Sequence, residues 1–174
     1  MRPRVLAASL RRWVDPAEAY VELCGDSDAA FWLDSGPSAT TGMSYLGLAS
    51  DVVTSFDSPV LDWLQAQRRD VDTTDAPDGF ALGWVGWLGY ELRAATMGEP
   101  ARESRYPDAA LMFVDRAVAF DHDTGEVWLL ALGADDDWSP ELAVWRDAIV
   151  TALETGRRGC ESTARLPSTT PAAR

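Results

Sequence analysis

Apolar residues occur along this chain mainly in short runs that are typical of strands. The runs alternate with polar residues or are continuously apolar, as in half-buried and fully buried strands, and Gly, Pro, Asp or Ser bounds them. They cover residues 5–14, 29–34, 43–48, 80–91, 110–121 and 127–132. The first run alternates poorly and is predicted to be an edge strand. Asp123, Thr124 and Gly125 form a turn sequence that predicts a hairpin of the last two runs.

Helix-start signals, in which Asp or Ser precedes Pro, occur at three places in the sequence. Such a pair combines an N-cap side chain with Pro at the first helical position. The pairs are Asp15-Pro16, Ser58-Pro59 and Ser139-Pro140. They predict helices over residues 16–24, 59–69 and 140–155.

The order of these elements indicates the fold class. Strands outnumber helices and do not alternate regularly with them, which argues against a doubly wound parallel sheet. The sequence predicts an α+β fold with a mainly antiparallel sheet and about three packed helices, in a single domain over residues 1–155. Residues 156–174 hold too few apolar side chains to join a core, which predicts a disordered tail.

Composition limits the classes of partner. The 174 residues are 47% apolar, and 28 acidic against 15 basic residues give a formal charge of −13. This charge repels phosphate backbones and anionic lipids, so neither nucleic acid nor a membrane surface is expected as a partner. Cys24 and Cys160 lie far apart and in no metal-binding spacing, and no apolar run is long enough for a membrane span. We expect reduced thiols and a cytoplasmic location.

Glycine recurs at positions 83, 86 and 89, which invites comparison with a phosphate-binding loop. The spacing fits neither the dinucleotide nor the P-loop motif, and the chain contains no Lys. Glycine within a strand more often admits a close backbone or a large ring. We therefore interpret these glycines as packing residues.

Polar residues near the predicted hairpin also suggest chemistry. Asp121 begins a pattern like a calcium loop, but the twelfth position is Leu132 instead of a carboxylate. Ser44 is one residue out of register for a nucleophile elbow, and His122 is the single imidazole, so a hydrolase triad is not favoured. One His and two isolated Cys argue against zinc. His122 is most simply a turn residue, and no metal site is predicted.

Asp115 and Arg116 are adjacent charges within an apolar run. Strand alternation would place them on opposite faces, where each needs its own partner if buried. Glu91 and Arg93 are the candidates. A structural ion pair is favoured over a role at a domain interface.

Three segments together resemble a known family. They are FWLDSG at 31–36, GFALGWVGWLGYELR at 79–93 and YPDAALMFVDRAVAFDH at 106–122. The chain resembles the amino-terminal domain of the aminodeoxychorismate synthase and anthranilate synthase component I family over residues 15–155. FWLDS is closer to the aminodeoxychorismate branch, para-aminobenzoate synthase component I, than to typical anthranilate synthases.

The resemblance implies an activity that this chain alone is not expected to have. The complete enzymes aminate chorismate for para-aminobenzoate and folate synthesis, with ammonia from a glutaminase subunit and with Mg²⁺. The magnesium-binding glutamates and the catalytic lysine belong to a later domain and have no counterpart here. We therefore assign no catalytic residue and no cofactor to this chain. Its expected partners are the chorismate-binding catalytic domain, in cis or in trans, and a glutaminase subunit.

The resemblance also implies a pocket for tryptophan. The matching positions are Asp34, Ser35, Thr40, Thr41, Gly42 and Met43. A carboxylate there can pair with the ammonium of the ligand, while hydroxyls and loop amides receive its other polar groups. Relatives usually have Arg in place of Gly42 and an aromatic residue in place of Met43.

Three hypotheses remain open. The chain is the amino-terminal portion of such an enzyme, a stand-alone module that binds an aromatic amino acid or regulates a relative, or half of a split enzyme. The first predicts an exposed apolar face where the catalytic domain docks. The second predicts a self-sufficient surface and a saturable ligand.

Overall fold

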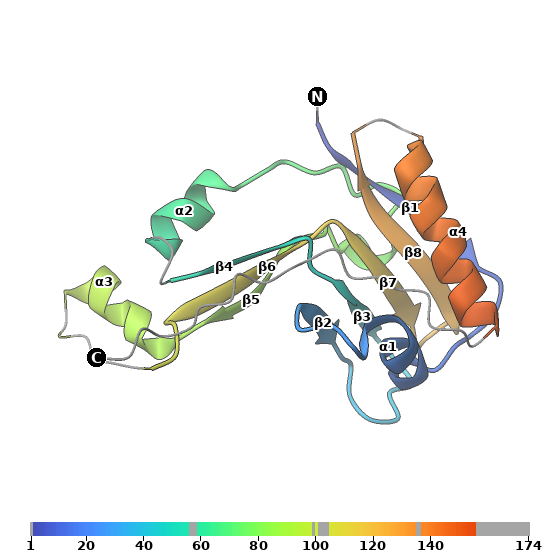
Figure 1. Cartoon of the computed structure of the whole chain (residues 1–174), viewed down its shortest axis with the longest axis horizontal. Helices are drawn as coiled ribbons and strands as arrows, with labels where there is room; N and C mark the ends of the chain where they lie inside the picture. Colours follow the sequence, from blue (N-terminus) through green and yellow to red (C-terminus); the bar gives the residue numbers. More distant parts are fainter. Residues whose placement is uncertain (1, 56–58, 99, 101–104, 135–136, 156–174) are drawn as a thin grey trace.

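Two antiparallel sheets lie end to end in the computed structural model, which describes residues 2–55, 59–98, 100, 105–134 and 137–155 (Figure 1). The larger sheet has five strands in the order β1-β8-β7-β3-β2. In that order their bounds are Arg4–Leu10, Glu126–Gly133, Arg116–Asp121, Met43–Leu48 and Ala30–Leu33. The smaller sheet has the order β4-β6-β5, with bounds Asp51–Thr54, Ala109–Val114 and Gly83–Leu88. The predicted α+β fold with antiparallel sheets is confirmed.

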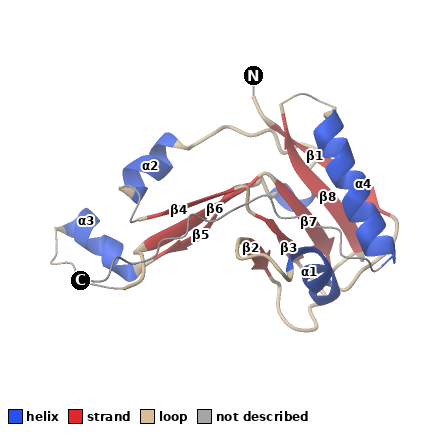
Figure 2. Cartoon of the chain, in the orientation of Figure 1, coloured by secondary structure: helices blue, strands red, loops and turns tan. Residues whose placement is uncertain are grey.

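Helices α1 and α4 cover one face of the larger sheet, whereas α2 and α3 lie at the far end of the molecule (Figure 2). The helices are α1 Pro16–Cys24, α2 Val60–Ala66, α3 Arg93–Met97 and α4 Pro140–Thr155. The predicted bounds of α1 and α4 are confirmed, and α2 is shorter than the predicted segment 59–69. Ser58, the predicted cap of α2, and the predicted tail lie outside the described residues. Among the described residues, no helix is both long and apolar enough to span a membrane.

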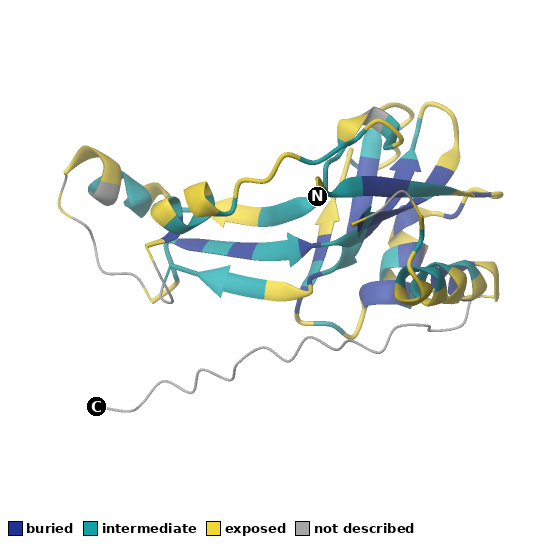
Figure 3. Ribbon diagram, turned by 90° about the horizontal axis from the view of Figure 1, so that it is seen from above, coloured by how far each residue is buried: buried dark blue, intermediate teal, exposed yellow. Residues whose placement is uncertain are grey.

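The larger sheet has an apolar core on each face. Along β7, Val118 and Phe120 face a core shared with α1 and α4, while Ala117 and Ala119 face a second core under the segment that carries Phe80. This alternation follows from the two-residue period of a strand. Figure 3 shows buried residues concentrated in the larger sheet and in the middle strand of the smaller one.

The run 110–121 was predicted to be one strand, and this is wrong. It divides at Asp115 into β6 and β7, which belong to different sheets. The Asp115 carbonyl accepts a hydrogen bond from the Leu132 amide at 2.8 Å, while Arg116 starts the ladder with β8. The predicted hairpin therefore consists of β7 and β8 only. The chain also passes from the larger sheet to the smaller one at Ser50, between β3 and β4. Strand β4 was not predicted.

The run 80–91 was also predicted to be one strand, but β5 ends at Leu88. A 3₁₀ turn over Tyr90–Leu92 and helix α3 follow. The residues after Gly89 include Glu, Leu, Arg and Ala, which favour a helix where the chain no longer pairs with a strand. A Cβ at Gly86 would lie 2.0 Å from the Ala110 carbonyl oxygen, and one at Gly89 would lie 2.8 Å from the Asp108 carbonyl oxygen. These two glycines confirm the packing interpretation. At Gly83 the reason is instead the backbone, with φ of +104° and no atom within 4 Å of a Cβ.

Candidate functional site

The six residues of the implied ligand site lie together on the surface, in the loop between β2 and β3 and at the start of β3. Met43 is half-buried and the other five are exposed. The loop is closed by the Ser35 hydroxyl, which donates to the Met43 carbonyl oxygen at 2.6 Å. The structure thus brings Asp34 and Ser35 next to Gly42 and Met43. It does not bring the side chains of Thr40 and Thr41 into this network.

Glycine at position 42 suits the conformation of the loop. Its φ is +85°, and a Cβ there would lie 3.1 Å from the Ser35 hydroxyl oxygen. A side chain at this position would be strained and would press on Ser35. Glycine at position 42 is therefore compatible with the closure of the loop by Ser35.

The turn between β7 and β8 anchors the end of this loop. The Gly42 amide donates to Asp123 Oδ2 at 2.9 Å, and the His122 amide donates to the Gly42 carbonyl oxygen at 2.9 Å. The loop is thus held by residues about 80 positions later in the chain. This connection could not be inferred from local sequence.

Ser44 and His122 form a cluster with Asp34 that the sequence analysis missed. Ser44 Oγ lies 3.1 Å from Asp34 Oδ1, 2.9 Å from His122 Nε2 and 3.1 Å from the Ser35 amide, and the Ser44 side chain is completely buried. His122 lies in the turn, as predicted, and its side chain also contacts Ser44, which was not predicted. The burial of Ser44 could have been predicted from the alternation along β3, which places Ser44 on the same face of the strand as the buried Leu46.

The same geometry does not provide a hydrolytic triad. In such a triad the imidazole stands between the carboxylate and the hydroxyl. Here the hydroxyl of Ser44 stands between Asp34 and His122, and it is not exposed to solvent. The cluster can hold a carboxylate in position, but it does not present an accessible nucleophile.

Asp121 organises the turn that carries His122 and Asp123. Desolvation acts to raise the pKa of Asp121, but hydrogen bonds from the Thr124 side chain and from the Thr124 and Asp123 amides, with attraction to His122, lower the pKa overall. Asp121 Oδ1 accepts from the Asp123 and Thr124 amides at 2.9 and 3.2 Å. The carboxylate thus caps a turn. No group of three potential metal ligands occurs among the described residues.

Asp115 and Arg116 pair with each other across the break between the sheets, at 3.3 Å. Both side chains are 27% exposed, and Arg116 also lies 3.6 Å from Glu141. The expected placement on opposite faces of one strand is wrong because there is no single strand here. Glu91 and Arg93 are not the partners seen for this pair; Arg93 lies over the Tyr90 ring instead.

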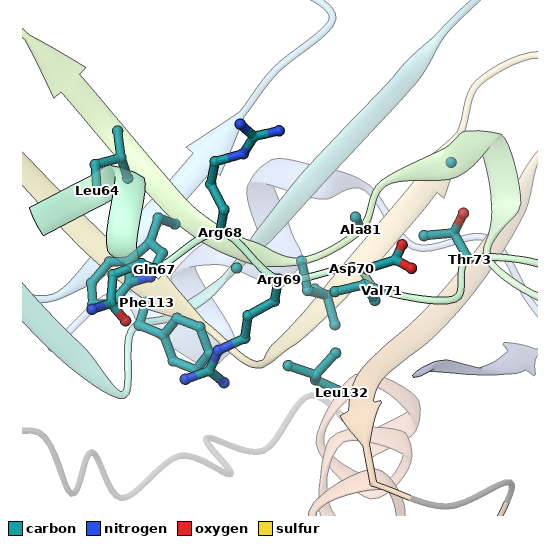
Figure 4. A pocket seen from close by; sticks show the side chains of 14 residues that line it. Leu64, Gln67, Arg68, Arg69, Asp70, Val71, Thr73, Ala81, Phe113 and Leu132 are labelled. Atoms are coloured by element: carbon teal, nitrogen blue, oxygen red, sulfur yellow. The ribbon is translucent and has the colours of Figure 1, made fainter. Parts of the chain in front are cut away.

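Two cavities border the smaller sheet, away from the implied ligand site. One, of about 470 Å³, is lined by residues that include Arg68, Arg69, Trp84 and Phe113 (Figure 4). Arg68 and Arg69 extend to opposite sides of the backbone in Figure 4, so they do not converge on one anion. The other, of about 400 Å³, lies at the end of the smaller sheet. None of the six predicted ligand residues lines either cavity.

Comparison with known proteins identifies the family. A family model described as chorismate binding enzyme matches residues 28–170, so the chain belongs to the chorismate binding enzyme family. A Streptomyces griseus protein named aminodeoxychorismate synthase is 36% identical over 88% of this chain and 24% of its own length. One of the same name from Streptomyces pristinaespiralis is 34% identical over 69% of this chain and 20% of its own.

A more distant relative supports the link to anthranilate synthase. Anthranilate synthase component 1 of Streptomyces coelicolor is 28% identical over 83% of this chain and 28% of its own length. The resemblance expected from the sequence motifs is therefore confirmed. The matched part of the chain spans between a fifth and just over a quarter of these relatives.

Proposed function

We propose that this chain is the amino-terminal, non-catalytic portion of an aminodeoxychorismate synthase component I-like enzyme. Its role is to complete a chorismate-binding catalytic part, in cis or in trans, that aminates chorismate for para-aminobenzoate and folate synthesis. Mg²⁺ and the catalytic residues belong to that other part, and a glutaminase subunit supplies ammonia. The assembly works in the cytoplasm.

The observation that carries this proposal is an exposed apolar surface at the end of the smaller sheet. We call it the apolar end, and it consists of Trp87, Leu88, Tyr90, Met97 and Tyr106, which are 46%, 52%, 75%, 72% and 59% exposed. Trp87, Tyr90 and Tyr106 also line the cavity of about 400 Å³. Three exposed aromatic side chains around one cavity form apolar surface of the kind that usually marks an interface.

The family and the coverage of its members favour one occupant for this surface. Relatives named aminodeoxychorismate synthase extend well beyond the matched region, because this chain covers 24% of one and 20% of another. β5 is an edge strand of the smaller sheet, so its outer backbone groups are open to a further strand. The chorismate-binding part of the same enzyme is therefore the proposed occupant.

An apolar dye and an activity assay test this proposal. The folded chain should bind the dye, and changing Trp87 and Tyr90 together to Ser should remove most of the signal. Val144→Ser on α4 is the matched control, because Val144 is 71% exposed but lies far from the apolar end. The chain alone should give no ammonia-dependent turnover of chorismate. Measurable product, or dye binding unchanged in the double variant, would contradict the proposal.

A second candidate function is binding of tryptophan or a similar amino acid at the loop after β2. The exposed carboxylate of Asp34, next to the Ser35 hydroxyl, favours it because a carboxylate can pair with an ammonium group. Calorimetry with L-tryptophan and with indole-3-propionate, which lacks the ammonium, tests it. Stronger binding of tryptophan that Asp34→Asn abolishes is the expected result. Equal affinity for the two compounds would reject this role of Asp34.

A further inference from the structure

Ser44 is a completely buried polar side chain with three polar neighbours. Its hydroxyl oxygen lies 3.1 Å from the Ser35 amide nitrogen, 3.1 Å from Asp34 Oδ1 and 2.9 Å from His122 Nε2. A hydroxyl has one hydrogen to donate and two lone pairs to accept with. Three contacts therefore use the whole hydrogen-bonding capacity of Ser44, which fixes the direction of each.

The direction of each bond follows from what the partners can do. The Ser35 amide can only donate, so it occupies one lone pair of Ser44. An ionised Asp34 carboxylate can only accept, so it takes the hydroxyl hydrogen. The remaining lone pair must be filled by His122, so Nε2 carries a hydrogen. The chain of bonds runs from His122 Nε2–H to Ser44 and from the Ser44 hydroxyl to Asp34.

We propose that His122, as the Nε2–H tautomer, is a positioning residue that fixes the Asp34 carboxylate through Ser44. This inference rests on the proposed amino-acid site, and it assigns His122 and Ser44 a part in recognising an ammonium group there. Asp34 is exposed, so its carboxylate keeps acceptor capacity for such a ligand. Ser44 leaves it in one orientation instead of several, which lowers the entropy lost on binding.

His122 is also held by a ring contact and by a backbone hydrogen bond. The Trp13 ring lies 5.4 Å from it between centroids, at an interplanar angle of 68°. The His122 amide donates to the Gly42 carbonyl oxygen, which ties the same residue to the loop of the proposed site. His122 thus connects the turn, the loop and the carboxylate.

Nuclear magnetic resonance can read the tautomer directly, because the 174-residue chain contains a single His. Long-range ¹H–¹⁵N correlation of the uniformly ¹⁵N-labelled chain should show neutral His122 with its hydrogen on Nε2. Ser44→Ala should give a mixture of tautomers, and Ser44→Thr, which keeps the hydroxyl, should restore one. An Nδ1–H tautomer in the folded wild-type chain would overturn the proposal without any variant.

Calorimetry with L-tryptophan then separates this proposal from the proposed site. His122→Phe, which keeps a ring beside Trp13, should weaken binding about 2- to 10-fold, whereas His122→Gln should retain most of it because the amide still donates. Equal affinities for wild type and His122→Phe would reject the positioning role. If no form binds tryptophan, the proposed ligand function fails, and the tautomer alone decides whether His122 holds Asp34.

Discussion

The two sheets of this chain differ in how completely they are covered. The larger sheet has a core on each face, with Phe120 and Leu130 fully buried on opposite sides. The smaller sheet packs with α2 around Ala109 and Leu111, but its end at Trp87 is exposed. Burial of apolar area is the main source of stability. We therefore expect the larger sheet to contribute most of the stability. The exposed end of the smaller sheet is the surface on which we propose that a partner docks.

The largest expected effect comes from opening the core of the larger sheet. Phe120→Ala removes a completely buried ring that packs edge-on against Trp13 at 6.0 Å. We expect a loss of about 3–5 kcal/mol in the free energy of unfolding, measured by urea denaturation. Tyr90→Ser, at a side chain 75% exposed, should change it by less than about 0.5 kcal/mol. Similar losses for both variants would refute the contrast between the sheets.

A second change should disrupt the smaller sheet selectively. Gly86→Ala places a Cβ 2.0 Å from the Ala110 carbonyl oxygen, and backbone cannot move aside as a flexible side chain can. We expect about 3 kcal/mol of destabilisation of this sheet. Hydrogen exchange should become fast in β5 and β6 and stay slow in β7 and β8.

Gly125→Ala is the matched control for that variant. Its φ is +72°, but a Cβ there would meet no atom within 4 Å. The cost should be about 1 kcal/mol, from backbone conformation alone. Loss of protection in β7 and β8 of Gly86→Ala would show that the sheets unfold together, contrary to the comparison.

The helices repeat the contrast on a smaller scale. Asp15 caps α1 by accepting from the Ala17 and Glu18 amides at 2.9 and 3.2 Å, whereas α2 has no side-chain cap. Asp15→Ala should cost about 1 kcal/mol in the free energy of unfolding. Even with this loss, amides of α1 should exchange more slowly than those of α2. The reverse order would show that caps and packing do not set the difference.

Local chemistry explains which parts of the fold could be predicted from the sequence. The start of α1 at Pro16 and the turn at Gly125 depend on residues within a few positions, and both were predicted correctly. The division at Asp115 was not, because Val114 and Ala117 are both buried and only the pairing partners show that they lie in different sheets. Apolar pattern reports burial, not the identity of the neighbouring strand.

The candidate site was predictable to the same extent. Of the residues carried by the family motif, Ser35 lies beside Gly42 and Asp34 contacts Ser44. The contact between Ser44 and His122 joins residues 78 positions apart, and no local rule predicts it. The sequence could therefore point to the loop after β2, while the contacts of this loop with the turn between β7 and β8 became apparent only from the fold.

The smallest predicted effect concerns Asp121, on the turn of the larger sheet. Its pKa is below the ordinary value of 3.8, so the ionised carboxylate stabilises the folded state above that pH. This contribution is lost as the pH falls through the folded-state pKa. Wild type should therefore be more stable than Asp121→Asn at pH 6, and the difference in urea midpoint should shrink below about pH 4.

Asp28→Asn provides the control for this titration. Asp28 is exposed, and its carboxylate makes no hydrogen bond within the described part of the chain. Its replacement should change the urea midpoint little at pH 6, because no hydrogen bond is lost. If Asp121→Asn behaved in the same way, the hydrogen bonds to its carboxylate would contribute nothing to folding. The turn that holds Gly42 would then be stabilised by the β7–β8 ladder and by its hydrogen bonds with Gly42.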